Sequence, residues 1–238
     1  MTADVALVTG ANKGLGRETA RRLAALGWTV FAGARDVGRG SAVVAELGAG
    51  GGDVRLVALD VTSDDSVDDA VAEVAGQVDH VDVLVNNAGI GGGWVEPLET
   101  GPDDFRACYE VNLLGPVRVT KAFLPLLRAA ALPRIVNVSS GMGSIGITTD
   151  PDRVESAFVG LVYPSSKTAL NMVTTMYAKA LPGWKVNAAD PGYTATDLNG
   201  HRGTKSVKEG AEPIVALATL GADGPTGGFF GAEGPLPW

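Results

Sequence analysis

A tyrosine and a lysine four residues apart are the side chains of this sequence whose types and spacing most directly suggest chemistry. They stand in the segment Tyr163-Pro164-Ser165-Ser166-Lys167. Residues at i and i+4 lie on one face of a helix, and proline suits a helix's first turn. An ammonium group beside a phenol favours the phenolate, so Lys167 is expected to lower the Tyr163 pKa from its usual ~10. Tyr163 would then serve as an acid or base near neutral pH; a surface lysine beside a half-buried tyrosine gives the same pattern.

The elements that must position this pair alternate between short β-branched runs and stretches of helix length. This alternation predicts βαβ units and a parallel sheet covered on both faces. The expected strands span residues 4–9, 28–33, 54–59, 81–86, 134–139 and 185–189, with a final strand at Phe229-Phe230. Among the expected helices are those near residues 41–47, 103–130, 163–181 and 205–220. No repeat or low-complexity block interrupts the series, so residues 1–238 are predicted to form one α/β domain.

Composition and charge exclude several classes of function. A net charge of −8 disfavours binding to nucleic acid or to an anionic membrane, because phosphate attracts the opposite sign. Cys108 is the only cysteine and the two histidines are far apart, so neither a disulfide nor a metal site is expected. No apolar run approaches the ~20 residues of a membrane span, and no signal segment is visible. We expect a soluble, cytoplasmic protein.

A glycine-rich turn follows the first expected strand, in the segment Gly10-Ala11-Asn12-Lys13-Gly14-Leu15-Gly16. In an open parallel sheet, ligands bind beyond the carboxyl ends of the strands. Glycines at such a turn let the backbone approach a phosphate at the following helix N-terminus. The spacing G-x-x-x-G-x-G differs from the G-x-G-x-x-G fingerprint, and glycines at a strand–helix turn are often purely structural.

Four motifs in order carry a family resemblance: the glycine turn, Asn86-Asn87-Ala88-Gly89, the pair Tyr163 and Lys167, and Pro191-Gly192. Together they resemble the classical short-chain dehydrogenases/reductases (SDRs), over essentially the whole chain. The resemblance implies a Rossmann-type, doubly wound sheet of about seven strands. It also implies a nicotinamide cofactor and hydride transfer at a carbonyl or alcohol carbon.

The family's catalytic residues correspond to four positions of this chain: Asn112, Ser140, Tyr163 and Lys167. The resemblance implies that Tyr163 exchanges the proton, while Lys167 tunes it and binds the nicotinamide ribose. A hydroxyl at Ser140 would hydrogen-bond the substrate oxygen; Ser139 is the neighbouring alternative. An asparagine is unfavourable inside a helix, so Asn112 is expected to mark a local break that holds water for a proton path to Lys167.

Several residues are expected to bind the cofactor, and a cation after the second strand indicates which one. Arg35, with Lys13 nearby, favours the 2′-phosphate of NADP(H) over NAD(H); a surface pair of Arg35 with Asp36 is the alternative. By resemblance, Asp60 and Val61 flank the adenine, and Asn86, Ala88 and Gly89 flank the central ribose. The remaining expected contacts are Gly10, Asn12, Gly14, Leu15, Gly16, Tyr163, Lys167, Pro191, Gly192, Thr194 and Thr196.

Two stretches are expected to decide the substrate. An insert at about 144–160 separates Ser140 from Tyr163 and resembles the carbonyl-reductase branch, and it leaves monomer, homodimer or a higher oligomer open. Residues 193–205 suit a substrate lid. Asp190 is expected to be either a buried acid or a cap of the cofactor loop, and Trp94, Tyr193 and His201 are candidate pocket residues or ordinary packing.

The predicted activity is NADPH-dependent reduction of a ketone or aldehyde, or the reverse oxidation of an alcohol. A non-catalytic NADP-binding regulator on the same fold is the alternative, because a fold does not determine function. A structural oligomer that merely packs Tyr163 and Lys167 leaves the glycine turn and Arg35 unexplained.

Overall fold

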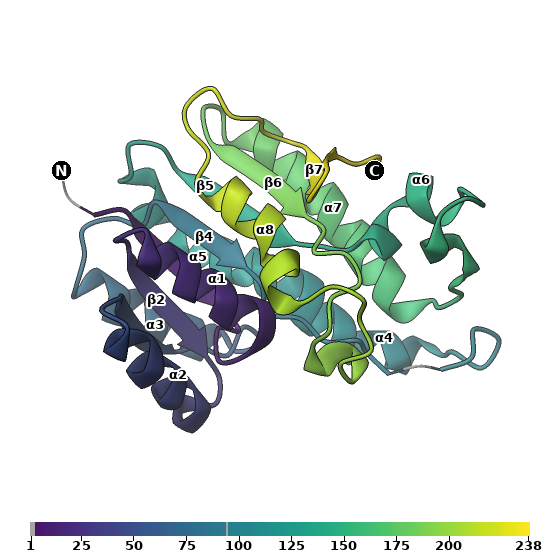
Figure 1. Cartoon of the computed structure of the whole chain (residues 1–238), viewed down its shortest axis with the longest axis horizontal. Coiled ribbons are helices and arrows are strands. Elements are labelled where there is room, and N and C mark those ends of the chain that lie inside the picture. Colours follow the sequence, from purple (N-terminus) through teal and green to yellow (C-terminus); the bar gives the residue numbers. More distant parts are fainter. Residues whose placement is uncertain (1–2, 94) are drawn as a thin grey trace.

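One sheet runs through the computed structural model, which describes residues 3–93 and 95–238, in the order β3-β2-β1-β4-β5-β6-β7-β8. Neighbouring strands from β3 to β7 are parallel, and β8 is antiparallel to β7. The strand order reverses between β1 and β4, and Figure 1 shows β4, β5 and β6 side by side. The strands are β1 Val5–Thr9, β2 Thr29–Ala34, β3 Asp53–Ala58, β4 Val83–Asn86, β5 Arg134–Val138, β6 Lys185–Ala189, β7 Phe229–Gly231 and β8 Gly234–Pro235.

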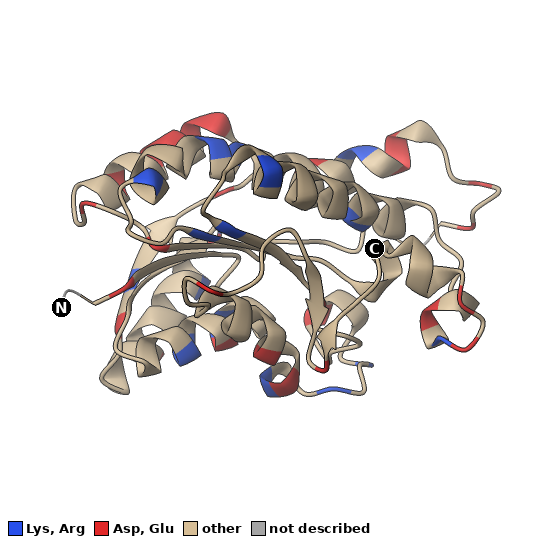
Figure 2. Cartoon of the chain, turned by 90° about the horizontal axis from the view of Figure 1, so that it is seen from above, with Lys and Arg blue, Asp and Glu red and all other residues tan. Residues whose placement is uncertain are grey.

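Helices cover both faces of this sheet, as Figure 2 shows from above. One face packs against α1, α2 and α8 through residues such as Leu23, Leu47 and Ile214. The other packs against α3, α5 and α7 through Val67, Phe123 and Tyr177, among others. The helices are α1 Gly14–Ala25, α2 Val37–Ala49, α3 Asp64–Ala75, α4 Pro102–Tyr109, α5 Gly115–Arg128, α6 Ile145–Thr148, α7 Val162–Ala180 and α8 Val207–Ala218. The fold is therefore a doubly wound, Rossmann-type α/β domain, as predicted.

Apart from shifts of one or two residues at other element ends, the structure differs from the sequence prediction at three places. Helix α2 begins at Val37 rather than near residue 41, because the Asp36 side chain caps it by accepting a hydrogen bond from the Arg39 N–H at 3.0 Å. Strand β8 brings the sheet to eight strands rather than about seven. The helical region expected at 103–130 is two α-helices joined by a π-helical turn, Glu110–Leu114, and Asn112 lies in that turn.

The expected insert projects from the body of the molecule beside α7 (Figure 1). It contains α6 and a 3₁₀ turn, Val154–Ala157. The C-terminal residues hold its first turn: the Gly146 N–H donates to the Trp238 carbonyl at 2.9 Å, and the Ser144 hydroxyl donates to the Pro237 carbonyl at 2.7 Å. Among the described residues, no helix combines the length and apolar character that crossing a bilayer requires.

Candidate active site

A cleft of about 1410 Å³ lies at the carboxyl ends of the parallel strands, where the strand order reverses. It is larger than the roughly 300–1,000 Å³ of a typical small-ligand pocket. The glycine turn, the ends of β2 and β3, the segment after β4, the N-terminal turn of α7 and the segment after β6 all contribute to its walls. The cleft therefore has room for a ligand of dinucleotide size together with a second, smaller molecule.

The glycine turn forms one wall because its backbone approaches the neighbouring segments too closely for side chains. Gly10 has a φ of 64°, and a Cβ there would lie 3.0 Å from the Ala88 Cα. A Cβ on Gly16 would lie 2.5 Å from both the Asn87 Nδ2 and the Gly10 carbonyl oxygen. These contacts explain physically why glycine is needed at both positions.

Helix α1 begins in this turn with no side-chain cap, and its first turn carries no acidic residue. The first N–H groups of an α-helix have no partner within the helix, and the helix dipole adds partial positive charge there. Gly14, Leu15 and Gly16 line the cleft, so this end of α1 faces it. An anionic group such as a phosphate would satisfy those N–H groups.

Two arginines line the cleft beyond the end of β2. Arg35 is exposed there, and its charge acts on Asp60 at the end of β3. Burial alone would raise the pKa of Asp60. Hydrogen bonds from the Thr62 N–H and hydroxyl lower this pKa, and so do the charges of Arg35 and Arg118. The net result is a pKa below the usual value. Arg39 also lines the cleft, because α2 begins early enough to carry it there. Sequence reasoning missed Arg39, although the capping pattern of Asp36 could have revealed it.

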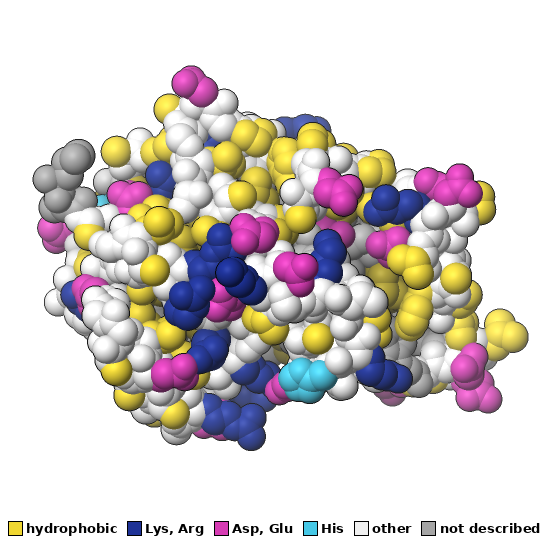
Figure 3. All heavy atoms as spheres, viewed as in Figure 1, with side chains coloured by type: hydrophobic (Ala, Val, Ile, Leu, Met, Phe, Trp, Pro, Cys, Tyr) yellow, Lys and Arg dark blue, Asp and Glu magenta, His cyan; other side chains and the backbone are white. Residues whose placement is uncertain are grey.

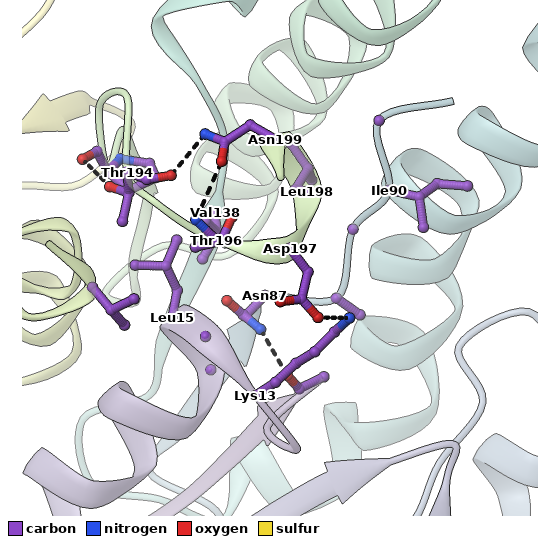
Figure 4. Close-up of a pocket in the computed structure, with 18 of the residues that line it drawn as sticks. Lys13, Leu15, Asn87, Ile90, Val138, Thr194, Thr196, Asp197, Leu198 and Asn199 are labelled. Carbon is purple, nitrogen blue, oxygen red and sulfur yellow. Dashed lines mark hydrogen bonds and ion pairs between the residues drawn. The ribbon is translucent and has the colours of Figure 1, made fainter. Parts of the chain in front are cut away.

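Lys13 is paired across the mouth of the cleft. Its Nζ lies 2.7 Å from the Asp197 Oδ2, and Figure 4 shows the two side chains pointing toward each other. Asp197 also contacts His201, whose Nε2 lies 2.9 Å from its Oδ1. Both members of the lysine pair are about half exposed, so it is a weak link between the glycine turn and residues 193–205. To bind a ligand phosphate, Lys13 would have to leave this partner.

Tyr163 lines the cleft, and its hydroxyl shares a hydrogen bond with the hydroxyl of Ser140. Ser140 follows β5 and caps a 3₁₀ turn, Gly141–Gly143, by accepting a hydrogen bond from the Met142 N–H at 3.2 Å. Ser139 is instead buried, and its hydroxyl donates to the Asn171 Oδ1 at 2.5 Å. Of the two adjacent serines, Ser140 is therefore the one whose hydroxyl reaches the tyrosine.

The predicted effect of Lys167 on Tyr163 is absent from this structure. Burial raises the pKa of the phenol, and the nearby Asp190 and Cys108 raise it further, against a lowering effect of the Ser140 hydrogen bond. The Lys167 Nζ lies 5.8 Å from the Tyr163 ring centroid and donates a 2.8 Å hydrogen bond to the Val138 carbonyl. Burial lowers the Lys167 pKa to about 8. Desolvation, which the four-residue spacing does not reveal, outweighs the expected attraction.

Asn112 is fully buried in the π-helical turn and holds the segment after β4 in place. Its Oδ1 accepts from the Ile90 N–H and its Nδ2 donates to the Ile90 carbonyl, both at 2.9 Å. The same Nδ2 lies 3.1 Å from the Ser166 hydroxyl, next to Lys167 in the chain. The predicted local change in the helix is therefore present, and these contacts make Asn112 a positioning residue. A water path to Lys167 stays a prediction.

Asn86 was expected at a cofactor ribose, but its side chain lies in the core. It is 2% exposed, and its Nδ2 donates to the Asn137 Oδ1 at 2.9 Å and to Thr120 at 3.2 Å. Asn87 lines the cleft instead, and its Nδ2 donates to the Thr9 carbonyl at 2.8 Å. Successive strand residues point to opposite faces of a sheet, and that alternation could have separated the two asparagines.

Residues 190–205 close the remaining side of the cleft. Asp190 satisfies both sequence alternatives: it is 7% exposed, and its Oδ1 accepts from the Gly192 N–H at 2.9 Å. Burial raises its pKa. The Thr194 side chain is buried and its hydroxyl donates to the Pro191 carbonyl at 3.0 Å, whereas Thr196 lies opposite Gly14. The tip of this segment thus contacts the glycine turn rather than only the substrate side.

Most of the predicted cofactor residues line the cleft: Gly10, Asn12, Lys13, Gly14, Leu15, Gly16, Arg35, Asp60, Val61, Ala88, Gly89, Tyr163, Lys167, Pro191, Gly192, Thr194 and Thr196. Tyr193 and His201 line it too, and Trp94 lies outside the described residues. The insert was expected at about 144–160, without any of its residues being assigned to the site. Three of them lie in the cleft wall: Val154, Glu155 and Phe158.

Cations on the outer face of α1 are paired with carboxylates. Figure 3 shows Lys and Arg interspersed with Asp and Glu on this side of the molecule. Arg21 pairs with Glu18 at 2.7 Å and Arg22 with Glu212 at 2.9 Å. In the part of the chain that the structure describes, no group of three or more His, Cys, Asp or Glu side chains could hold a metal ion.

Comparisons with known proteins place this site in a family. The model of the family described as short chain dehydrogenase matches residues 4–206. A short-chain dehydrogenase of Penicillium roqueforti is 37% identical over 230 residues, covering 93% of this chain and 91% of the relative. The (+)-neomenthol dehydrogenase of Arabidopsis thaliana is 34% identical over 284 residues, covering 96% of each chain. The structure of NADPH-bound carbonyl reductase from chicken fatty liver superposes with a TM-score of 0.87 at 28% identity, covering 100% of each chain.

The chain therefore belongs to the short-chain dehydrogenase/reductase family. It is an oxidoreductase of carbonyl or alcohol groups, and nicotinamide cofactors serve that family.

Proposed function

We propose that the protein is an NADPH-dependent reductase of ketones or aldehydes, with Tyr163 as the proton donor. The observation that carries the proposal is one cleft lined by Tyr163, by the uncapped end of α1 and by the two arginines after β2, with the Ser140 hydroxyl hydrogen-bonded to Tyr163. The relatives named neomenthol dehydrogenase and carbonyl reductase support the reaction class.

The residues of the cleft suit a dinucleotide that carries a 2′-phosphate. The bare glycine turn and the N-terminus of α1 would hold the pyrophosphate. Arg35, with Arg39 beside it, would hold the 2′-phosphate, since a guanidinium pairs strongly with phosphate oxygens. Asp60 and Val61 would flank the adenine, and Ala88 and Gly89 the ribose next to the nicotinamide.

The reduced nicotinamide, when bound, supplies the hydride for the carbonyl carbon. The Ser140 hydroxyl hydrogen-bonds the carbonyl oxygen and stabilises the negative charge that develops on it. The Tyr163 hydroxyl gives its proton to that oxygen, and the product is the alcohol. The raised pKa leaves the phenol protonated at neutral pH, which is the state this step requires. Asn112 positions the segment after β4, and Lys167 lies behind the tyrosine ring.

Turnover of a panel of aldehydes, ketones and quinones, each with NADPH and with NADH, tests this function. We expect oxidation of NADPH by at least one carbonyl compound, with a preference over NADH of about tenfold or more, equivalent to ~1.4 kcal/mol. Tight NADPH binding without turnover across the panel would favour a non-catalytic NADP-binding regulator. Equal use of NADH would count against the roles of Arg35 and Arg39.

The role of residues 193–205 as a lid, a cytoplasmic location and a monomeric or homodimeric state stay predictions. Sedimentation of the purified protein would decide the oligomeric state, and fractionation of the source cells would decide the location.

A further inference from the structure

The insert contributes one acidic side chain to the cleft wall, next to apolar ones. The apolar lining includes Met142 from the turn after β5 and Val154 and Phe158 from the insert. Glu155, in the 3₁₀ turn Val154–Ala157, lines the cleft between them. The sequence analysis named the insert as the stretch that decides the substrate, and Glu155 is its charged contribution to the wall.

The Glu155 carboxylate is poorly satisfied by the protein. Its Oε2 is buried and has no hydrogen-bond partner among the described residues. The nearest cation is Arg153, whose Nε lies 3.7 Å from that oxygen, beyond hydrogen-bonding distance. A buried acceptor without a donor costs about 1–3 kcal/mol. Native structures seldom retain such a group without a donor. Because the Glu155 side chain lines the cleft, a rotation of its carboxylate would turn this shielded oxygen toward a ligand there.

Glu155 also lies close to the reacting groups. Gly141 directly follows Ser140, and a Cβ at Gly141 would be 3.0 Å from the Glu155 Oε1 and 3.3 Å from the Asp190 Oδ2. The negative charge of Glu155 adds to burial in raising the Asp190 pKa, and Asp190 in turn acts on Tyr163. Two carboxyl groups thus flank the glycine beside the catalytic serine, in space that any larger residue at 141 would fill.

We propose that Glu155 is a specificity-determining residue, which accepts a hydrogen bond from a donor group on an otherwise apolar carbonyl substrate. This inference rests on the proposed reductase function. An ammonium group is the strongest such donor for a carboxylate and a hydroxyl group is the neutral one. The apolar side chains of Met142, Val154 and Phe158 would contact the carbon skeleton, while Ser140 and Tyr163 hold the carbonyl oxygen.

Three para-substituted acetophenones, carrying a methyl, a hydroxymethyl or an aminomethyl group, test the proposal on one skeleton. Glu155→Gln keeps the shape of the side chain and removes its charge. We expect this variant to raise the KM for the aminomethyl ketone about tenfold, a change of ~1.4 kcal/mol. The KM for the methyl ketone should stay within about twofold, because that ketone offers no donor to a carboxylate. A raised KM for the hydroxymethyl ketone as well would show that Glu155 also accepts hydrogen bonds from neutral donors.

Asp152→Asn is the matched control, since it removes one negative charge from an exposed position of the same insert outside the cleft. It should leave all three KM values unchanged. An equal effect of both variants would mean that distant charge, rather than contact, discriminates the substrates, and the inference would be overturned. A uniform fall in kcat for all three ketones in Glu155→Gln would overturn it too.

If no ketone is turned over, the proposed function fails, but the site can still be tested by binding. Calorimetric titration with 4-methylbenzylamine, in the presence of NADPH, should then show weaker binding to Glu155→Gln than to wild type and to Asp152→Asn. Equal binding to all three proteins would overturn the role of Glu155 independently of catalysis.

Discussion

The glycine turn and the insert form two walls of one cleft, but different contacts hold them in place. The glycine turn is attached to the centre of the sheet: the Ala11 N–H donates to the Gly33 carbonyl at 2.9 Å, and Asn87 donates to the Thr9 carbonyl at 2.8 Å. The insert is attached at its start, where Ser144 and Gly146 bond the C-terminal residues. Its far part is open to solvent, with Val154 81% and Val159 73% exposed.

Because of this difference, the glycine turn should tolerate few substitutions, whereas the insert should tolerate many. At Gly10 and Gly16, a single added methyl group would collide with the segment after β4 or with the turn's own backbone, so few substitutions are tolerated there. In the insert, side chains can change without disturbing the sheet, because loops on the surface tolerate variation. Under the proposed function, cofactor binding and substrate choice would thus fall to different walls of one cleft, which Tyr163 also lines.

The largest expected effect comes from substituting Tyr163, which lines the cleft together with both walls. Tyr163→Phe removes the proton donor but keeps the ring, so kcat/KM for a carbonyl substrate should fall by roughly 10²–10⁴-fold. NADPH binding, followed by fluorescence, and the melting temperature should change little. Activity equal to that of wild type would rule out Tyr163 as the acid. Ser139→Ala is a useful comparison, because that hydroxyl bonds Asn171 and should not act on substrate.

The second effect is on stability, at the lysine behind the tyrosine. Burial lowers the Lys167 pKa from 10.5 to about 8. Between these pH values the unfolded chain keeps a proton that the folded protein has released, so the free energy of unfolding should rise with pH across that window. The rise should amount to roughly 3 kcal/mol, and Lys167→Met should lack it.

Urea unfolding between pH 7 and pH 10, of wild type and Lys167→Met, measures this difference. Lys179→Met is the control, because Lys179 is exposed on the same helix. The same pH slope in wild type and Lys167→Met would show that Lys167 is not desolvated as the structure indicates.

The third effect is confined to the side of the cleft formed by the glycine turn and the arginines after β2, which we call the cofactor wall. Arg35→Ala should raise the KM for NADPH about tenfold, ~1.4 kcal/mol, and leave the KM for NADH unchanged, because only NADPH carries the 2′-phosphate. Arg39→Ala should act in the same direction. Arg128→Ala, an exposed arginine at the end of α5, controls for the overall loss of charge. A parallel change for both cofactors would argue against a phosphate contact.

Much of the fold and of the cofactor wall could be predicted from the sequence, because both depend on local patterns. Strand β6 has the predicted bounds, and the alternation of β-branched runs with helical segments predicted the parallel sheet. Strand β8 could not be recognised, since two residues, Gly234–Pro235, carry no periodicity. The start of α2 was misplaced because the capping role of Asp36 was overlooked, and Arg39 was missed with it.

The opposite side of the cleft, formed by the insert and the segments around Tyr163, is the substrate wall. It was less predictable, because it depends on contacts between distant segments. The spacing of Tyr163 and Lys167 suggested a lowered tyrosine pKa, but burial by the surrounding elements raises it. The closeness of Glu155 to Gly141 and Asp190 arises only when the insert folds back over the turn after β5. The ion pair of Lys13 with Asp197 joins residues 184 positions apart, which no local pattern reveals.

The smallest expected effect tests whether the C-terminal residues position the substrate wall. The Trp238 ring stacks on Phe229 with centroids 5.6 Å apart, and its carbonyl accepts the hydrogen bond from Gly146. Trp238→Ala removes the stacking and should lower the free energy of unfolding by about 1 kcal/mol. The loosened insert should raise the KM for the carbonyl substrate about threefold, ~0.7 kcal/mol, without changing the KM for NADPH. Leu98→Ala, at a fully exposed residue away from this contact, should change neither KM. Equal increases in both KM values would show that the two walls are coupled, because an anchor of the insert alone should leave the glycine turn unaffected.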